Sequence, residues 1–141
     1  MSLIRSIFVL AGFLILFGCV ASGPAPTTVQ LSVAGTGDMN GGAPAKVKVY
    51  YLASTGTFRT ADFFTVFNSP ETALGGDLIA VDEIQLAPGR TVNNTRTFPT
   101  APAAIGVVAA FRDIDGAKFL DVRPFNDKVR VVVSRNSVSI R

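Results

Sequence analysis

The stretch that decides the fold runs from Lys46 to Tyr51 and reads KVKVYY. Its two valines and its second tyrosine alternate with the two lysines and the first tyrosine. A period of two is typical of a β-strand that packs one face on a core and turns the other face to water. The stretch therefore predicts a strand, and much of the remaining chain repeats its pattern.

The same alternation recurs at 28–33, 128–133 and 138–141, and further strands are expected at 78–86, 91–98 and 118–122. Ile105–Phe111 (IGVVAAF) is apolar on both faces, so we expect a central strand there. Asp82 and Glu83 interrupt their strand, which indicates a bulge or an edge position. Clusters of Gly, Pro, Asn and Asp separate these stretches. The pattern predicts an all-β fold: an antiparallel sandwich of two sheets with about eight strands.

One segment departs from the strand pattern and predicts a short helical insert over residues 60–74. Thr60 can cap a first helix. Three phenylalanines then lie near one face of that helix: Phe63, Phe64 and Phe67. Ser69-Pro70-Glu71 predicts a second helix start, and Gly75-Gly76 predicts its end. We expect the three phenylalanines to pack on the sandwich rather than to bind a ligand.

The amino-terminal segment has the order of features found in a signal peptide. Arg5 precedes an apolar run of eleven residues, 7–17. As a helix this run would span roughly 16 Å, about half of the hydrocarbon core of a bilayer, which is too short for a comfortable transmembrane helix. The junction Leu16-Phe17-Gly18-Cys19 resembles a bacterial lipobox, in which the cysteine is acylated and becomes the new amino terminus.

The resemblance divides the chain into three parts. We expect residues 1–18 to be a lipoprotein signal peptide, residues 19–27 to be the acylated Cys19 and a flexible tether, and residues 28–141 to be the β-sandwich domain. Val20 takes the place of the aspartate that retains lipoproteins in the inner membrane, which favours the periplasmic face of the outer membrane. A buried free cysteine and an ordinary signal peptide are the alternatives for Cys19.

The composition of this 141-residue chain limits the kinds of catalysis, metal binding and partner that it can support. Hydrophobic residues make up 48% and charged residues 16%, which excludes a disordered chain. There is no histidine and only one cysteine, so the usual proton shuttle, an intrachain disulfide and a four-ligand zinc site are all disfavoured. Without residues 1–18, 12 basic residues face 10 acidic ones, a balance too even to indicate a nucleic-acid partner. We expect no catalytic residues, no metal and no cofactor.

Two acidic motifs have simple structural interpretations. Asp113-Ile114-Asp115-Gly116 resembles part of a calcium loop but lacks its further oxygen ligands and distal glutamate, so a hairpin turn is expected. Asp82 and Glu83 are adjacent on a predicted strand and should point to opposite faces, which prevents them from forming an acid–base pair.

The loop Thr36–Pro44 (TGDMNGGAP) is a candidate binding surface. Its three glycines indicate mobility, and it presents Met39, an apolar side chain that an exposed loop does not need. Methionine adapts well to protein interfaces. A plain, long hairpin loop is the alternative, and composition alone does not separate the two.

A set of short motifs in a fixed order resembles the TssJ family of type VI secretion outer-membrane lipoproteins. The motifs are Cys19, the loop with Asn40, Lys48–Leu52 (KVYYL), Phe58, Ala61-Asp62-Phe63, Asp77-Leu78, Leu86–Gly89 (LAPG), Ile105–Arg112 (IGVVAAFR) and Lys118–Pro124 (KFLDVRP). Phe119 stands where the family commonly has tryptophan.

The resemblance implies a transthyretin-like sandwich with a helical addition and a non-enzymatic role. Family members hold the periplasmic domain of the inner-membrane protein TssM, alongside TssL, and contact it through the loop between the first two strands. Carried onto this chain, the contact falls on Gly37, Asp38, Met39 and Asn40.

Two hypotheses of function follow, with an enzyme as a distant third. The first is a lipid-anchored adaptor that tethers a TssM-like protein to the outer membrane, and it predicts a filled core and an exposed loop. The alternative is a periplasmic lipoprotein that binds a small ligand or another envelope partner, and its small-ligand form predicts an enclosed apolar pocket.

Overall fold

The structure, a computed structural model, describes residues 18, 23 and 25–141. The predicted signal peptide, the predicted acylation site Cys19 and most of the predicted tether lie outside the described residues. The strands are β1 (Thr27–Gly35), β2 (Ala45–Leu52), β3 (Leu78–Leu86), β4 (Thr91–Phe98), β5 (Ala104–Ala109), β6 (Leu120–Pro124), β7 (Lys128–Val133) and β8 (Val138–Ile140). They form two four-stranded sheets, which confirms the predicted sandwich.

We call the sheet with strand order β4-β1-β7-β8 sheet A and the sheet with order β3-β2-β5-β6 sheet B. All pairings within the sheets are antiparallel except that of β1 with β7, which is parallel. The parallel pair arises because β6 belongs to sheet B, so that the chain crosses between the sheets before β7 joins β1. The sandwich is therefore mostly, and not wholly, antiparallel.

The predicted strands agree closely with the observed ones. β3 and β4 have the predicted bounds, and β5 is an interior strand as expected. β6 begins at Leu120 rather than at Lys118, which forms an isolated bridge with Ser137. β3 is an edge strand, so Asp82 and Glu83 do mark an edge, whereas the register irregularity of this pair lies at Tyr51 and Leu52.

The main core fills the space between the sheets. Alternate residues of β1 (Val29, Leu31 and Val33) face Val47, Val49 and Tyr51 of β2, and all six are buried. The rings of Tyr51 and Phe98 lie 4.7 Å apart between their centroids. The opposite faces of β1 and β7 carry mostly polar side chains, with Ala34 and Val132 as exceptions, which is close to the alternation that the sequence predicted.

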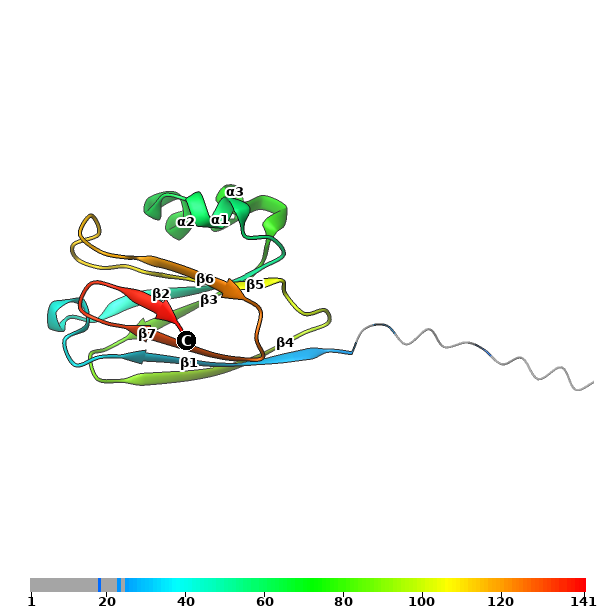
Figure 1. Cartoon of the computed structure of the whole chain (residues 1–141), viewed down its shortest axis with the longest axis horizontal. Helices are drawn as coiled ribbons and strands as arrows, with labels where there is room; N and C mark the ends of the chain where they lie inside the picture. The colour runs from blue at the N-terminus through cyan, green and yellow to red at the C-terminus, as the bar shows by residue number, and fades with distance from the viewer. Residues whose placement is uncertain (1–17, 19–22, 24) are drawn as a thin grey trace, which may run out of the picture.

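A layer of short helices covers the outer face of sheet B (Figure 1). The helices are α1 (Gly56–Thr60), α2 (Phe63–Asn68) and α3 (Pro70–Leu74), followed by the 3₁₀ turn η2 (Gly75–Asp77). The ring of Phe58 of α1 packs closely against Gly106 of β5, where a Cβ atom would meet the ring at 2.5 Å. A second apolar cluster joins the helices to the sheet: Tyr50, Leu52, Phe58, Val66, Leu74, Ala104, Val108 and Val122. In the described part of the chain, no helix has both the length and the hydropathy needed to cross a membrane.

The helix boundaries correct one prediction and confirm another. Thr60 does not cap a helix but ends α1, and Asp62 caps α2, accepting a hydrogen bond from the Thr65 N–H at 3.0 Å. Asp62 takes this position because its backbone is extended (φ −73°, ψ 153°), as an N-cap requires. The second start is confirmed, since Pro70 opens α3 and Gly75 follows it.

The three phenylalanines of α2 have different environments. Phe63 and Phe67 stack with their centroids 5.0 Å apart and pack against the second cluster, as predicted. Phe64 is 64% exposed, so the expectation that it packs on the sandwich is wrong. The physical reason is helical geometry, because residues four apart share a face whereas adjacent residues are about 100° apart.

Candidate functional site

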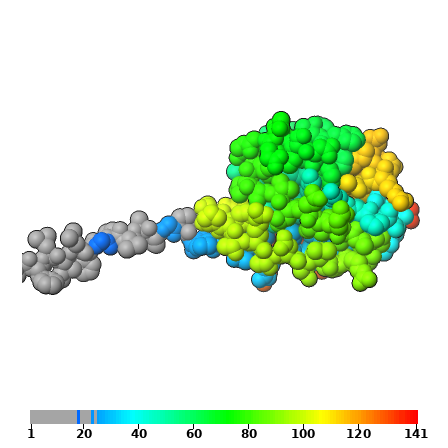
Figure 2. Space-filling model, turned by 180° about the vertical axis from the view of Figure 1, so that it is seen from behind, coloured from blue at the N-terminus to red at the C-terminus, as the bar shows by residue number. Residues whose placement is uncertain are grey.

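Four connections meet at one end of the sandwich, which we call the loop end. They are residues 36–44, 87–90, 110–119 and 134–137. The pairing directions explain the gathering, because β1, β3, β5 and β7 run toward this end and the following strands lead away from it. The start of β1 lies at the opposite end (Figure 1). Figure 2 shows the loop that follows β1 (cyan) beside the loop that follows β5 (orange) at the loop end.

The loop after β1 is ordered around Met39, which opens the 3₁₀ turn η1 (Met39–Gly42). Met39 is completely buried and belongs to the main core, so the prediction that the loop displays it is wrong. The reason lies in Gly35: its missing side chain leaves the space that the Met39 sulfur occupies, and a Cβ atom there would clash with this sulfur. Met39 therefore anchors the loop and does not present an apolar surface.

Asn40 joins the loop to two neighbouring connections. Its backbone N–H donates to the Ser134 carbonyl at 3.2 Å, and its side-chain Nδ2 donates to the Pro44 carbonyl at 3.0 Å. Its Oδ1 accepts a hydrogen bond from the Arg112 N–H at 2.8 Å. The residue is 5% exposed and has a left-handed backbone (φ 48°), which asparagine tolerates better than most residues. These hydrogen bonds tie the loop to its neighbours at Asn40, although its glycines predicted a mobile loop.

The exposed part of the loop carries charge. Thr36 Oγ1 donates a hydrogen bond to Asp38 Oδ1 at 2.7 Å, and Arg135 Nε lies 3.5 Å from Asp38 Oδ2. The hydrogen bond from Thr36, together with the positive charge of Arg135, lowers the pKa of Asp38 below its ordinary value. Asp38 is therefore ionised at neutral pH and faces solvent as half of an exposed ion pair.

Beside this ion pair the surface is hollowed. The hollow has a volume of about 300 Å³ and is lined by Asn40, Gly41, Phe111, Arg112, Asp113, Arg135 and Asn136. Of the predicted contact residues, Gly37 and Asp38 are exposed, whereas Met39 and Asn40 are buried. Sequence reasoning missed Arg112, which follows the predicted strand 105–111, and Arg135, which lies between the predicted strands 128–133 and 138–141.

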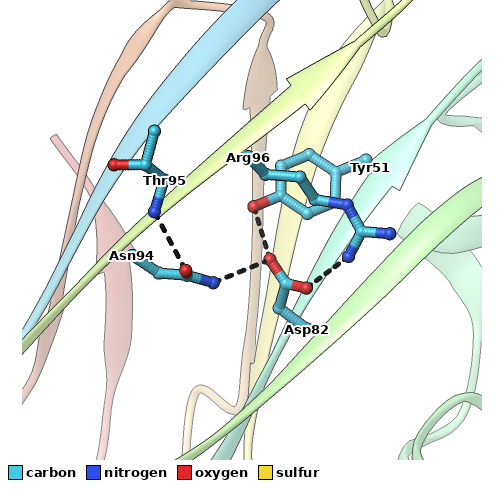
Figure 3. A network of polar contacts seen from close by, with 5 residues as sticks. All are labelled: Tyr51, Asp82, Asn94, Thr95 and Arg96. Carbon is cyan, nitrogen blue, oxygen red and sulfur yellow. Dashed lines mark hydrogen bonds and ion pairs between the residues drawn. The ribbon is translucent and has the colours of Figure 1, made fainter.

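Asp82 illustrates a polar network with a structural role (Figure 3). Its carboxylate accepts hydrogen bonds from Tyr51 Oη at 2.9 Å and Asn94 Nδ2 at 3.3 Å, and it pairs with the Arg96 guanidinium. Burial, together with the hydrogen bond to Asp82, raises the pKa of Tyr51, so the phenol stays protonated and donates. The network joins β3 of sheet B to β4 of sheet A at one edge of the sandwich.

The other acidic motifs match their structural interpretations. Glu83 points away from Asp82 and pairs with Lys46 at 2.8 Å and Lys48 at 3.6 Å. Asp113 Oδ1 accepts a hydrogen bond from the Gly116 N–H at 3.1 Å, which closes a turn in the β5–β6 hairpin. Within residues 18, 23 and 25–141, no group of three or more His, Cys, Asp or Glu side chains is placed to hold a metal ion.

Comparisons with known proteins bear on what this arrangement does. The structure of the T6SS lipoprotein TssJ1 from Pseudomonas aeruginosa is similar with a TM-score of 0.76 and 27% identity, covering 82% of this chain and 95% of that one. Serratia marcescens Lip, a membrane-bound component of the type VI secretion system, gives 0.73 and 24%, covering 83% and 98%. A chain of a type VI membrane complex gives 0.72 and 24%, covering 82% and 98%.

A search of curated proteins finds no match to this chain. The family model described as "Type VI secretion lipoprotein, VasD, EvfM, TssJ" matches residues 27–140, which include all eight strands and the helical layer. The chain therefore belongs to the type VI secretion lipoprotein family that includes TssJ.

Proposed function

We propose that this chain is the outer-membrane lipoprotein of a type VI secretion membrane complex and tethers a TssM-like inner-membrane protein to the outer membrane. The observation that carries the proposal is the family match over residues 27–140. In this role the chain is a non-enzymatic adaptor, and a TssL-like component belongs to the same complex. Its position is the periplasmic face of the outer membrane.

The anchor in this proposal is Cys19. A single acyl chain holds a protein only marginally on a membrane, whereas several chains on one residue hold it stably. Residues 20–26 connect the anchor to β1, and seven extended residues reach about 23 Å. This length lets the domain hang clear of the membrane surface.

The arrangement of the two ends supports the tethering role. The segment from Cys19 joins the sandwich at the start of β1, and the loop end lies at the other end of the same strand (Figure 1). Nine residues of strand span about 30 Å. An anchor at one end and a partner at the other would thus be separated by the length of the sandwich.

The partner-binding surface in this proposal is the loop end. Gly37 and Asp38 provide direct contacts, together with the exposed Arg112 and Arg135 around the hollow. Met39 and Asn40 contribute from inside, because they hold the loop in shape. A preformed loop loses less conformational entropy on binding than a mobile one, which favours affinity.

The loop assignment is tested by charge reversal at Arg135, with Arg59→Glu on the helical layer as the matched control. We expect Arg135→Glu to weaken binding of the TssM-like periplasmic domain by about tenfold, because the Asp38–Arg135 pair lies at the proposed contact. The measurement is surface plasmon resonance with the thermal unfolding midpoint as a check of folding. Equal affinities of Arg135→Glu and the wild-type chain would contradict the assignment.

The anchor is tested separately by Cys19→Ser. We expect unprocessed precursor to accumulate and the chain to disappear from the outer-membrane fraction, because serine offers no sulfur for acylation. The measurement is metabolic labelling with a fatty acid, followed by membrane fractionation. Normal labelling of the variant would contradict lipidation at Cys19.

A further inference from the structure

The outer face of sheet A differs from that of sheet B. Helices cover sheet B, whereas no element within the described residues covers sheet A (Figure 1). The alternation of β1 places Gln30 and Ser32 on this bare face, while Val29, Leu31 and Val33 point into the core. The face is thus lined mostly by polar side chains and remains accessible to a partner.

A shallow groove of about 380 Å³ runs over β1 on this face. Ser32 lies opposite Asn93 of β4 on one side and Arg130 of β7 on the other. Gln30 lies opposite Thr95 and Lys128 in the same way. The short Ser32 forms the floor, and the two rims have different chemistry. One rim consists of amide and hydroxyl groups and the other of basic groups.

The row of basic residues along one rim continues beyond the groove to Arg141. Lys128 and Arg130 are two residues apart on one strand, which places them about 7 Å apart on the same face. The Arg141 N–H donates to the Arg130 carbonyl at 2.8 Å, and the register of β7 and β8 places Arg141 opposite Arg130. Like charges directly opposite each other on neighbouring strands are destabilising.

No carboxylate side chain of the described residues forms an ion pair with these three basic side chains. Lys128, Arg130 and Arg141 form no ion pair there, whereas the carboxylates of Asp38, Asp82, Glu83 and Asp121 pair with basic groups elsewhere. Asp127 precedes β7 and forms no ion pair with these residues. Basic groups that gather on one face without paired carboxylates raise the local positive potential, which attracts an anionic partner.

We propose that this groove binds an extended acidic peptide segment of another protein. Carboxylates of the segment would pair with Lys128, Arg130 and Arg141, and its backbone would hydrogen-bond to the amides and hydroxyls of Asn93 and Thr95. The groove has no aromatic lining residue, and it therefore lacks the stacking surface typical of single-stranded nucleic-acid sites. The site lies on the side of the sandwich, apart from the loop end, and does not depend on the tethering role.

The test uses the full chain and poly-L-glutamate as the probe, with isothermal titration calorimetry at low ionic strength. We expect binding that weakens as salt increases, because the contacts are exposed ion pairs. The double variant Lys128→Glu/Arg130→Glu should lose affinity by about tenfold or more. Arg59→Glu, which changes the net charge on the helical layer, should change it by less than about twofold.

A second variant distinguishes binding of the peptide within the groove from nonspecific attraction to the positive charge of the surface. Ser32→Leu fills the floor without altering any charge, and we expect it to weaken binding of poly-L-glutamate by about tenfold because it prevents the segment from lying along β1. The thermal unfolding midpoint of each variant is measured in parallel. The proposal is overturned if poly-L-glutamate does not bind, if Arg59→Glu weakens binding as much as the double variant, or if a folded Ser32→Leu variant binds like the wild-type chain.

Discussion

At the scale of single residues, Asn40 determines the shape of the loop end. Through its backbone and side chain it joins the loop after β1 to Arg112 and Ser134 on two other connections. Buried amide groups that lose their partners cost free energy, since water does not replace the lost bonds. The family resemblance placed Asn40 at the partner contact, whereas the structure gives it a supporting position.

We expect Asn40→Gly to lower the free energy of unfolding by about 1–3 kcal/mol, because glycine adopts the left-handed backbone but leaves the Arg112 N–H without its acceptor. Asn136→Gly, at an exposed position nearby, is the control and should change stability little. Urea unfolding followed by circular dichroism measures both. A wild-type midpoint for Asn40→Gly would show that these bonds do not hold the loop end together.

Met39 shows why part of the candidate site was not predictable. A methionine within a run of glycines and polar residues is expected to be exposed. No local sequence pattern distinguishes a buried methionine in such a loop from an exposed one. The space that receives it depends on Gly35, four residues earlier, and on the core between the sheets. The residue types were therefore visible in the sequence, but their burial was a property of the tertiary structure.

At the scale of elements, the strands were predictable because each has one wet face and a clear turn at its end. β3 and β4 have the expected bounds for this reason. The parallel pairing of β1 with β7 was not predictable, since it joins residues about a hundred positions apart and leaves no local signal. The first helix cap was assigned to Thr60 rather than Asp62 because both residue types cap helices well.

The cap of α2 has a testable dependence on pH. Hydrogen bonds from Thr65 lower the pKa of Asp62 below its ordinary value. A carboxyl group with a lowered pKa in the folded chain stabilises it above the unfolded pKa of about 3.9, and the stabilisation is lost as pH falls through the folded pKa. Asp62→Ala should therefore lower the thermal unfolding midpoint at neutral pH but not at strongly acidic pH.

Asp62→Asn is the matched control for this prediction. Asparagine caps helices about as well as aspartate and does not titrate, so Asp62→Asn should match the wild-type chain at neutral pH and be the more stable of the two at strongly acidic pH. Differential scanning calorimetry across the acidic range measures the three chains. An Asp62→Ala deficit that persists unchanged below the pKa of the carboxyl group would contradict an ionised cap.

At the scale of the whole molecule, two carboxylates join the sheets at opposite edges of the sandwich. Asp82 links β3 to β4, and Asp121 of β6 accepts a hydrogen bond from the Ile140 N–H of β8 at 2.8 Å. The aromatic ring of Phe119, in the position where the family commonly has tryptophan, packs against both apolar clusters. The sandwich is thus held together at its edges as well as through its core.

We expect Asp82→Ala to lower the free energy of unfolding by about 1–3 kcal/mol, because it leaves the Tyr51 hydroxyl and the Arg96 guanidinium without their acceptor. Glu83→Ala is the neighbouring control, and its exposed pairs with Lys46 and Lys48 should contribute little. Guanidinium chloride unfolding compares the two variants. Equal losses would contradict a specific role of Asp82 in joining the sheets.

The position of β1 has a mechanical consequence. It is an interior strand, hydrogen-bonded to β4 on one side and to β7 on the other. In the proposed arrangement, a force between the two membranes would act along the axis of this strand. Its ladders would then be loaded in shear, with many bonds sharing the force at once, instead of being unzipped one after another. In that arrangement, the strand order of sheet A would make the domain resist extension.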